Sequence, residues 1–124
     1  MIINMKHYKE LIIWQKGIEI VKKIYAITKH FPNEEKFGIV AQLTRAAVSI
    51  PANIAEGSSR NSDKDYARFL QIALGSAFEI QTYCRIAKEM NWVKVEEINE
   101  VKILVEEEIK MIHRFINTLN KANS

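Results

Sequence analysis

The sequence predicts an all-α fold, an antiparallel up-and-down four-helix bundle that occupies residues 1–124 as a single domain. Apolar residues recur at the spacing of one helical face through four long segments. Three short links rich in Asn, Ser, Asp, Gly or Pro separate these segments, and links this short make consecutive helices antiparallel neighbours. A hydrophobic content of 48% in 124 residues is enough to form one core without metal or disulfide cross-links.

The predicted helices span approximately residues 10–29, 34–57, 63–90 and 95–120. Asn33 and Ser62 are predicted N-caps, because acidic residues follow each of them and suit the positive end of a helix dipole. Gly57 is predicted to end the second helix in a left-handed cap. The lone Cys84 falls at an apolar helical position and is expected to be a buried, reduced thiol.

The first helix is apolar over more of its circumference than one core needs. Its predicted core stripe comprises Leu11, Trp14, Ile18, Val21, Tyr25 and Thr28. Additional apolar residues lie beside this stripe and beside the core stripe of the fourth helix. Because soluble monomers rarely expose large apolar patches, we expect a homo-oligomer. Its predicted interface comprises Ile13, Ile20, Ile24, Ile27, Leu104, Met111 and Phe115. The alternative is that the wide stripes form one thick core.

A polar line runs along the second helix and comprises Gln42, Arg45, Ser49, Asn53 and Glu56. No lysine or aspartate occurs between residues 37 and 57, so this helix is expected to be enclosed on most sides, with Arg45 and Glu56 partly buried. Buried charges need partners, and Glu79 on the third helix is the expected partner of Arg45. We interpret the line, together with Glu79, as a structural polar network that fixes helix register; the alternative is a binding or catalytic site.

The sequence lacks the usual motifs of enzymes and cofactor-binding proteins. His7, His30 and His113 are scattered, and none lies three residues after a glutamate, as di-iron bundles require. Gly-rich phosphate loops, paired-Cys zinc spacings and nucleophile motifs are also missing. Glu106–Glu108 are expected to form a solvated face, because consecutive residues point in different directions around a helix. We therefore expect no enzymatic activity, no cofactor and no metal.

Hydropathy and charge predict the cellular location of the protein and the kind of partner it contacts. No apolar run approaches the roughly 20 residues of a membrane span, and the first ten residues lack a signal-peptide cleavage site, so we expect a cytoplasmic protein. The formal net charge is +3, and the excess lies in residues 1–30, which contain six lysines and two glutamates. Such a skew supports salt-sensitive contact with nucleic acid; the alternative is an ordinary solvated helix face.

Several segments together resemble a known family. They are residues 14–16 (Trp-Gln-Lys), Phe31–Pro32 followed by Glu35 and Gly38, residues 45–57 (RAAVSIPANIAEG), Arg60, and residues 69–79 (FLQIALGSAFE). On these residues the chain resembles the four-helix-bundle family of 23S ribosomal RNA intervening-sequence proteins, which is related to the accessory proteins of diversity-generating retroelements. The similarity extends from Tyr8 to about Lys121 and so covers nearly the whole chain.

The resemblance implies a ring-shaped homopentamer, in agreement with the doubled apolar stripes. The retroelement relatives bind nucleic acid and a reverse transcriptase through a basic surface. The resemblance therefore implies a non-enzymatic oligomer that associates with nucleic acid, and we expect structured RNA. The expected contacts are Lys9, Lys16, Lys22, Lys23, Arg60, Lys64 and Arg68. The alternative is an oligomeric scaffold that recruits a protein partner, which a neutral or acidic exposed face would favour.

Overall fold

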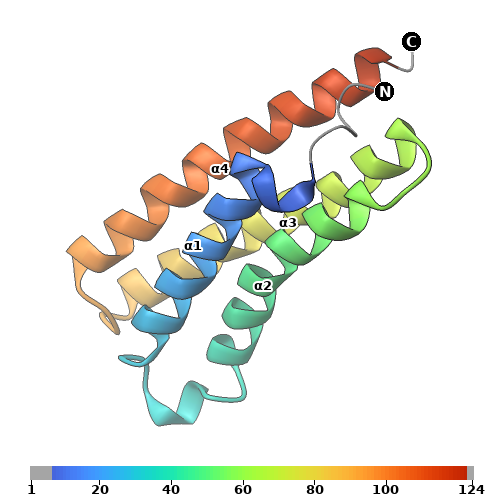
Figure 1. Cartoon of the computed structure of the whole chain (residues 1–124). Coiled ribbons are helices and arrows are strands. Elements are labelled where there is room, and N and C mark those ends of the chain that lie inside the picture. Colours follow the sequence, from blue (N-terminus) through green and yellow to red (C-terminus); the bar gives the residue numbers. More distant parts are fainter. Residues whose placement is uncertain (1–6, 123–124) are drawn as a thin grey trace.

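The computed structural model describes residues 7–122 and contains four α-helices and two short 3₁₀ helices in that range (Figure 1). The long helices are α1 (Ile12–Thr28), α2 (Ile39–Ser58), α3 (Asp63–Glu89) and α4 (Val95–Ala122). The 3₁₀ helices η2 (Tyr8–Glu10) and η3 (Asn33–Glu35) precede α1 and α2 respectively. Residues 7–122 contain no β-strand. The fold is therefore all-α, as predicted.

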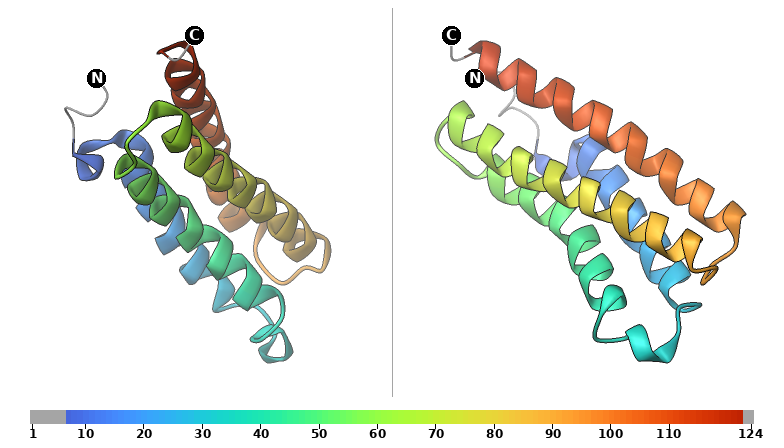
Figure 2. Two further views of the ribbon diagram at one scale, coloured as in Figure 1. Left: turned by 90° about the vertical axis from the view of Figure 1, so that its right-hand side faces the viewer. Right: turned by 180° about the vertical axis from the view of Figure 1, so that it is seen from behind.

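Consecutive helices run in opposite directions, and α4 returns beside α1 to close the bundle (Figures 1 and 2). Each helix contacts the next one along the chain, and α1 also contacts α4. The core lies between all four helices and is mostly aliphatic. Its fully buried side chains include one or more from every helix, among them Ile20, Leu43, Leu70 and Ile112. Burial of these aliphatic residues is the main force that holds the helices together.

Local capping chemistry sets both ends of α3. The Ser62 hydroxyl accepts a hydrogen bond from the backbone N–H of Asp65 at 3.1 Å, which confirms the predicted N-cap. At the other end, Asn91 adopts a left-handed conformation with φ of 59°. The N–H of Trp92 then donates to the carbonyl of Ala87 at 3.0 Å, and the N–H of Asn91 donates to the carbonyl of Lys88 at 3.1 Å. This pair of bonds is the Schellman cap, and it redirects the chain into α4.

The predicted start of the second helix and its predicted left-handed cap are wrong, whereas its last residue is within one position of the prediction. The helix begins at Ile39, after Gly38, and residues 33–35 form the separate turn η3, so Asn33 does not cap it. Gly57 lies inside α2, and no glycine among residues 7–122 has a positive φ. A Cβ at Gly57 would lie only 2.8 Å from Tyr66 Cδ1 and 3.0 Å from Phe69 Cβ. This glycine therefore serves the close approach of α2 and α3.

The predicted core stripe of α1 is wrong in part. Leu11, Trp14 and Val21 are partly buried and pack against the core, but the stripe predicted to lie at an interface is the more deeply buried one. Ile13, Ile20, Ile24 and Ile27 are buried in the core, whereas Ile18 and Tyr25 face outward and are 36% and 50% exposed. Gly17 explains the difference, because it shares the buried side of α1 with these isoleucines. A Cβ there would lie 3.3 Å from both Ile50 and Pro51 of α2. The smallest residue of the helix thus turns this side inward.

This burial overturns the α1 part of the predicted oligomer interface. Ile13, Ile20, Ile24 and Ile27 are enclosed within one subunit and are not available to a neighbour. Leu104, Met111 and Phe115 on α4 are partly buried and pack against the same core. The ring of Phe115 meets that of Tyr66 edge-on, with centroids 5.2 Å apart. For the four isoleucines the thick-core alternative is the correct one, whereas Leu104, Met111 and Phe115 keep part of their surface exposed and their place in an interface stays a prediction.

In residues 7–122 no helix combines the length and the hydropathy that a transmembrane segment needs.

Candidate nucleic-acid interface

Three of the predicted contact residues gather at the end of the bundle where α2 meets α3. Arg60 lies in the α2–α3 turn, while Lys64 and Arg68 occupy the first two turns of α3, four residues apart and hence on one side of the helix. They border an open recess of about 630 Å³, lined by Ser59, Arg60, Asn61, Ser62, Lys64, Asp65 and Arg68. The structure therefore brings these three of the seven predicted contact residues together.

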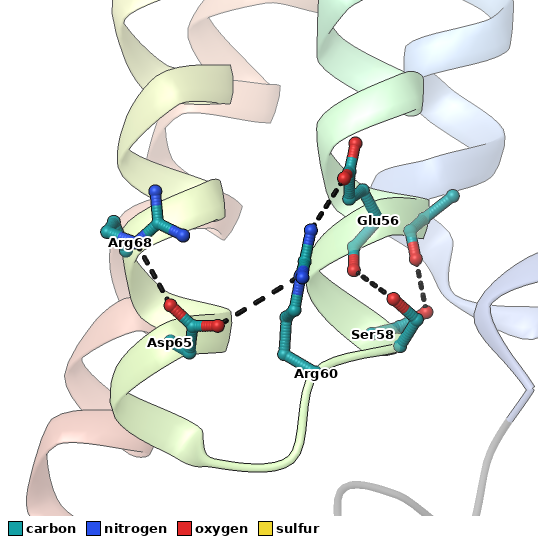
Figure 3. A network of polar contacts seen from close by, with 7 residues as sticks. Glu56, Ser58, Arg60, Asp65 and Arg68 are labelled. Carbon is teal, nitrogen blue, oxygen red and sulfur yellow. Dashed lines mark hydrogen bonds and ion pairs between the residues drawn. The ribbon is translucent and has the colours of Figure 1, made fainter.

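Two carboxylates hold the arginines in place. Arg60 pairs with Glu56, one helical turn earlier, at 2.6 Å, and its Nε lies 4.0 Å from Asp65 Oδ2. Arg68 Nε donates to the other oxygen of Asp65 at 3.0 Å. Figure 3 shows Asp65 between the two arginines and Glu56 above Arg60. These contacts fix both guanidinium groups at the edge of the recess.

An aromatic ring also orients the arginines. The guanidinium carbons of Arg60 and Arg68 each lie 4.5 Å from the ring centroid of Phe69. Phe69 is itself buried, so the core anchors the ring. Cation–π contacts of this kind are worth about 0.5–1 kcal/mol at exposed sites. Lys64 has none of the ion pairs found within residues 7–122, and so it supplies the free charge of the recess.

The recess has the chemistry of a weak anion-binding surface. Its cations and the side-chain amide of Asn61 are hydrogen-bond donors, which suit phosphate oxygens. Three cations face two carboxylates, Glu56 and Asp65, so the net charge is small. Within residues 7–122 there is no group of three or more His, Cys, Asp or Glu side chains positioned to hold a metal ion.

The other four predicted contacts, Lys9 of η2 and Lys16, Lys22 and Lys23 of α1, do not gather at one recess as the first three do. Lys16 pairs with Glu107 of α4 at 2.8 Å, and Lys23 pairs with Glu100 at 3.0 Å. Lys9 and Lys22 are exposed and make no ion pair in the described part of the chain. The glutamates of α4 thus neutralise two of the four lysines on this side of the bundle.

The polar line of α2 divides into separate groups. Ser49 joins α2 to α3 through a 2.8 Å hydrogen bond between its hydroxyl and that of Ser76, and Asn53 Nδ2 donates to the Ser49 hydroxyl at 2.9 Å. These bonds form a small register-fixing network. The remaining members, Gln42, Arg45, Glu56 and Glu79, are exposed.

The predicted environment of the two charged residues on α2 is therefore wrong for the isolated subunit. Arg45 and Glu56 are exposed rather than partly buried. Glu56 pairs with Arg60, and no ion pair joins Arg45 to Glu79 within residues 7–122. The sequence pattern correctly placed these residues on one side of α2, but it did not predict how exposed that side is.

Glu108 is a fully buried carboxyl group that the sequence interpretation missed. The Glu108 side chain was predicted to be solvated, but the residue is 0% exposed, and both of its carboxylate oxygens lack a hydrogen-bond partner. Oε2 lies 3.4 Å from the position of a Cβ on Gly17, so the glycine leaves room for it. Burial raises the pKa of Glu108 to about 8, and the charge of Lys16 opposes this rise. Its spacing from Val101, Val105 and Ile112 was the available signal, since these positions share one side of α4.

The architecture is that of a small helical bundle, and the lining of its recess is suited to anions. The chain belongs to the 23S rRNA-intervening sequence protein family, whose family model matches residues 9–114. The fold is also similar to a crystal structure described as a protein with unknown function from the S23 ribosomal protein family of Bacteroides thetaiotaomicron VPI-5482. That similarity has a TM-score of 0.78 and 26% identity and covers 85% of this chain and 98% of the other. A comparison with curated proteins gives no match.

Proposed function

We propose that this protein is a non-enzymatic, oligomeric member of its family that associates with structured RNA through the recess at the α2–α3 end. The observation that carries the proposal is the convergence of Arg60, Lys64 and Arg68 on one open recess. Arginine and lysine on a polar surface are the residues that contact nucleic-acid phosphates. Membership of a family named for insertions in 23S rRNA is consistent with an RNA partner.

The geometry favours backbone contact over sequence readout. Both arginines are held by carboxylates and by the Phe69 ring, so the cationic surface is shallow and largely fixed. Contacts of this type recognise phosphate positions and lose affinity as salt rises. Because the charge of each subunit is modest, useful affinity would come from several subunits bound to one RNA.

Self-association is the second part of the proposal. The family resemblance implies a homopentamer, and repeated recesses around such an assembly would provide the avidity that one subunit lacks. The near-neutral exposed surface of α2 supports an assembly of this kind. The same surface is the observation that favours the second candidate function, an oligomeric scaffold that recruits a protein partner.

The RNA proposal is tested by paired charge reversals. We expect the double variant Lys64→Glu/Arg68→Glu to reduce binding of a structured RNA hairpin by tenfold or more at low salt, measured by fluorescence anisotropy. The control is Lys102→Glu/Lys110→Glu, which makes the same charge change at exposed positions of α4. Equal losses in both variants would show that only total charge matters. No binding by the unmodified protein at low salt would reject the RNA role and favour the scaffold.

A further inference from the structure

Asp65 places a carboxylate between the two arginines of the α2–α3 recess, where an anionic ligand would have to bind (Figure 3). One of its oxygens accepts a hydrogen bond from Arg68 Nε at 3.0 Å, and the other lies 4.0 Å from Arg60 Nε. The recess is open, and the side chain of Asp65 is 36% exposed, so an incoming molecule can reach this carboxylate. The protein therefore supplies the recess with an anion of its own.

Contacts other than Asp65 also hold the two arginines. Arg60 pairs with Glu56 at 2.6 Å, and its guanidinium carbon lies 4.5 Å from the ring centroid of Phe69. The guanidinium carbon of Arg68 lies at the same distance from the same buried ring. These contacts do not involve Asp65. Its carboxylate is therefore an occupant of the recess rather than the only support of the arginines.

The carboxylate is a good partner for only one of the two arginines. Arg60 Nε is buried and has no hydrogen-bond partner, since 4.0 Å from Asp65 is too long for a hydrogen bond. A buried donor without a partner is destabilising. A phosphate group has more acceptor oxygens on a larger framework than a carboxylate, and guanidinium groups suit phosphate geometry. A phosphate is therefore a better partner for the two arginines together than Asp65 is.

The start of α3 offers the carboxylate a second partner. Asp65 is the third residue of α3, and its N–H donates to the hydroxyl of the N-cap residue, Ser62. In a capping box, the side chain of the third helical residue accepts a hydrogen bond in return from the N–H of the N-cap residue. The N–H of Ser62 donates none of the hydrogen bonds found within residues 7–122. The helix dipole also favours a carboxylate there, so Asp65 has an alternative to the arginines.

We propose that Asp65 is a built-in competitor, which an RNA phosphate displaces when it binds between Arg60 and Arg68. The displaced carboxylate turns to the N-cap of α3, while Glu56 and Phe69 keep the guanidinium groups in place. The competitor lowers the affinity of the recess for isolated anions. A folded RNA overcomes it because many phosphates lie close together on one molecule. This inference rests on the proposed RNA association and assigns a regulating residue to the same site.

The test compares two matched neutral variants in binding of a structured RNA hairpin, measured by fluorescence anisotropy. Asp65→Asn removes the competing charge and preserves the size of the side chain. Glu89→Gln removes the same charge from the Arg85–Glu89 pair, which lies about 36 Å farther along α3. We expect Asp65→Asn to bind about fivefold to tenfold more tightly than the unmodified protein. Glu89→Gln should stay within about twofold of it, because salt screens so distant a charge.

Salt dependence distinguishes a competitor from a support. Without the competing carboxylate, one more cation is free to neutralise a phosphate, so the slope of log affinity against log salt should steepen by about one unit in Asp65→Asn. Loss of a support would weaken binding and flatten the slope. Circular dichroism should show unchanged helix content. Asp65→Ala is the second variant, and it should also bind more tightly than the unmodified protein.

The remaining outcomes separate this inference from the proposed function. Equal or weaker binding by folded Asp65→Asn would overturn the competitor role and leave RNA association intact. Equal gains in Asp65→Asn and Glu89→Gln would overturn it as well, because only total charge would matter. Binding by Asp65→Asn but not by the unmodified protein would support a strong competitor. Absence of RNA binding by every variant at low salt would reject the RNA role and this inference together.

Discussion

The α1–α4 side and the α2 face present opposite kinds of surface on the same bundle. Across α1 and α4, Lys16 meets Glu107 and Lys23 meets Glu100, so these two pairs of facing charges are satisfied within the subunit. On the α2 face, by which we mean the outward side of α2 and the adjoining edge of α3, Arg45 and Glu79 take part in none of the ion pairs found within residues 7–122. The two surfaces therefore differ in whether facing charges pair within the subunit, and under the proposed self-association the unpaired charges are the ones available to another subunit.

The interior beneath the two surfaces also differs. Under the α2 face, Ser49, Asn53 and Ser76 satisfy one another by hydrogen bonds. Under the α1–α4 side lies Glu108, whose carboxylate has no hydrogen-bond partner. A buried polar group without a partner costs about 1–3 kcal/mol. The side of the bundle that is well satisfied at its surface therefore contains a destabilising group inside.

The largest expected effect tests which side of α1 faces the core. Ile20 is 0% exposed, whereas Ile18 is 36% exposed. We expect Ile20→Ala to lower the free energy of unfolding by about 2–5 kcal/mol, because it leaves a cavity between helices. The matched variant Ile18→Ala should cost less than about 1 kcal/mol. Urea denaturation measures both values, and a larger loss for Ile18→Ala would mean that the helix is turned the other way.

The next effect concerns the pH dependence caused by Glu108. Because its folded pKa of about 8 lies above the ordinary value of 4.5, the folded state retains a proton that the unfolded state has lost. Stability should therefore fall as pH rises from about 4.5 to about 8, by a few kcal/mol in total. Glu108→Met removes the carboxyl and should flatten this part of the profile.

Urea denaturation at several pH values between 5 and 8 checks this expectation. At the upper end we expect Glu108→Met to be more stable than the unmodified protein by roughly 1–4 kcal/mol. Glu107→Met is the control, because the carboxylate of Glu107 adjoins Glu108 in the sequence but lies on the surface and is paired with Lys16. Stability of the unmodified protein that increases with pH over this range would contradict a protonated, buried Glu108.

A smaller effect is expected from the unpaired charges of the α2 face. Arg45→Glu and Glu79→Arg should each raise the dissociation constant of the oligomer about tenfold, because each places like charges opposite one another. The double variant Arg45→Glu/Glu79→Arg should recover most of the lost affinity. Sedimentation velocity over a dilution series measures these constants. Additive losses in the double variant would show that the two residues do not meet across the contact.

The smallest effect is expected from the ion pairs of the α1–α4 side. Lys23→Ala should change the free energy of unfolding by no more than about 1 kcal/mol, because exposed ion pairs contribute little. The oligomeric mass should not change. A loss of assembly in Lys23→Ala would place a subunit contact on this side and remove the distinction between the two surfaces.

Local chemistry made much of the fold predictable from sequence. The polar links fixed the number of helices, and the Ser62 cap was identified because its side chain acts within one turn. The orientation of α1 was not predictable in the same way, since isoleucines on two sides give the helix no single apolar face. Packing at Gly17 decides between them, and this contact involves Ile50 and Pro51, which are distant in sequence.

The candidate site was predictable to a similar degree. The spacing of Lys64 and Arg68 placed them on one side of a helix, and the short turn kept Arg60 nearby. Their pairing with Glu56 and Asp65 depends on side-chain conformations that spacing does not specify. Glu108 was missed because three consecutive glutamates resemble a solvated segment, although one residue of the three shares the buried side of α4.

Thiol reactivity provides the most direct test of the difference between the two surfaces. Ala52→Cys places a thiol on the α2 face, and Ile103→Cys places one on exposed α4, while the native Cys84 is buried and burial raises its pKa to about 12. We predict that the Ala52→Cys thiol reacts with a maleimide at least tenfold more slowly than the Ile103→Cys thiol in concentrated protein. On dilution below the dissociation constant, the two rates should converge. Equal rates at every concentration would contradict the account, because the α2 face would then be open to solvent in the assembled protein.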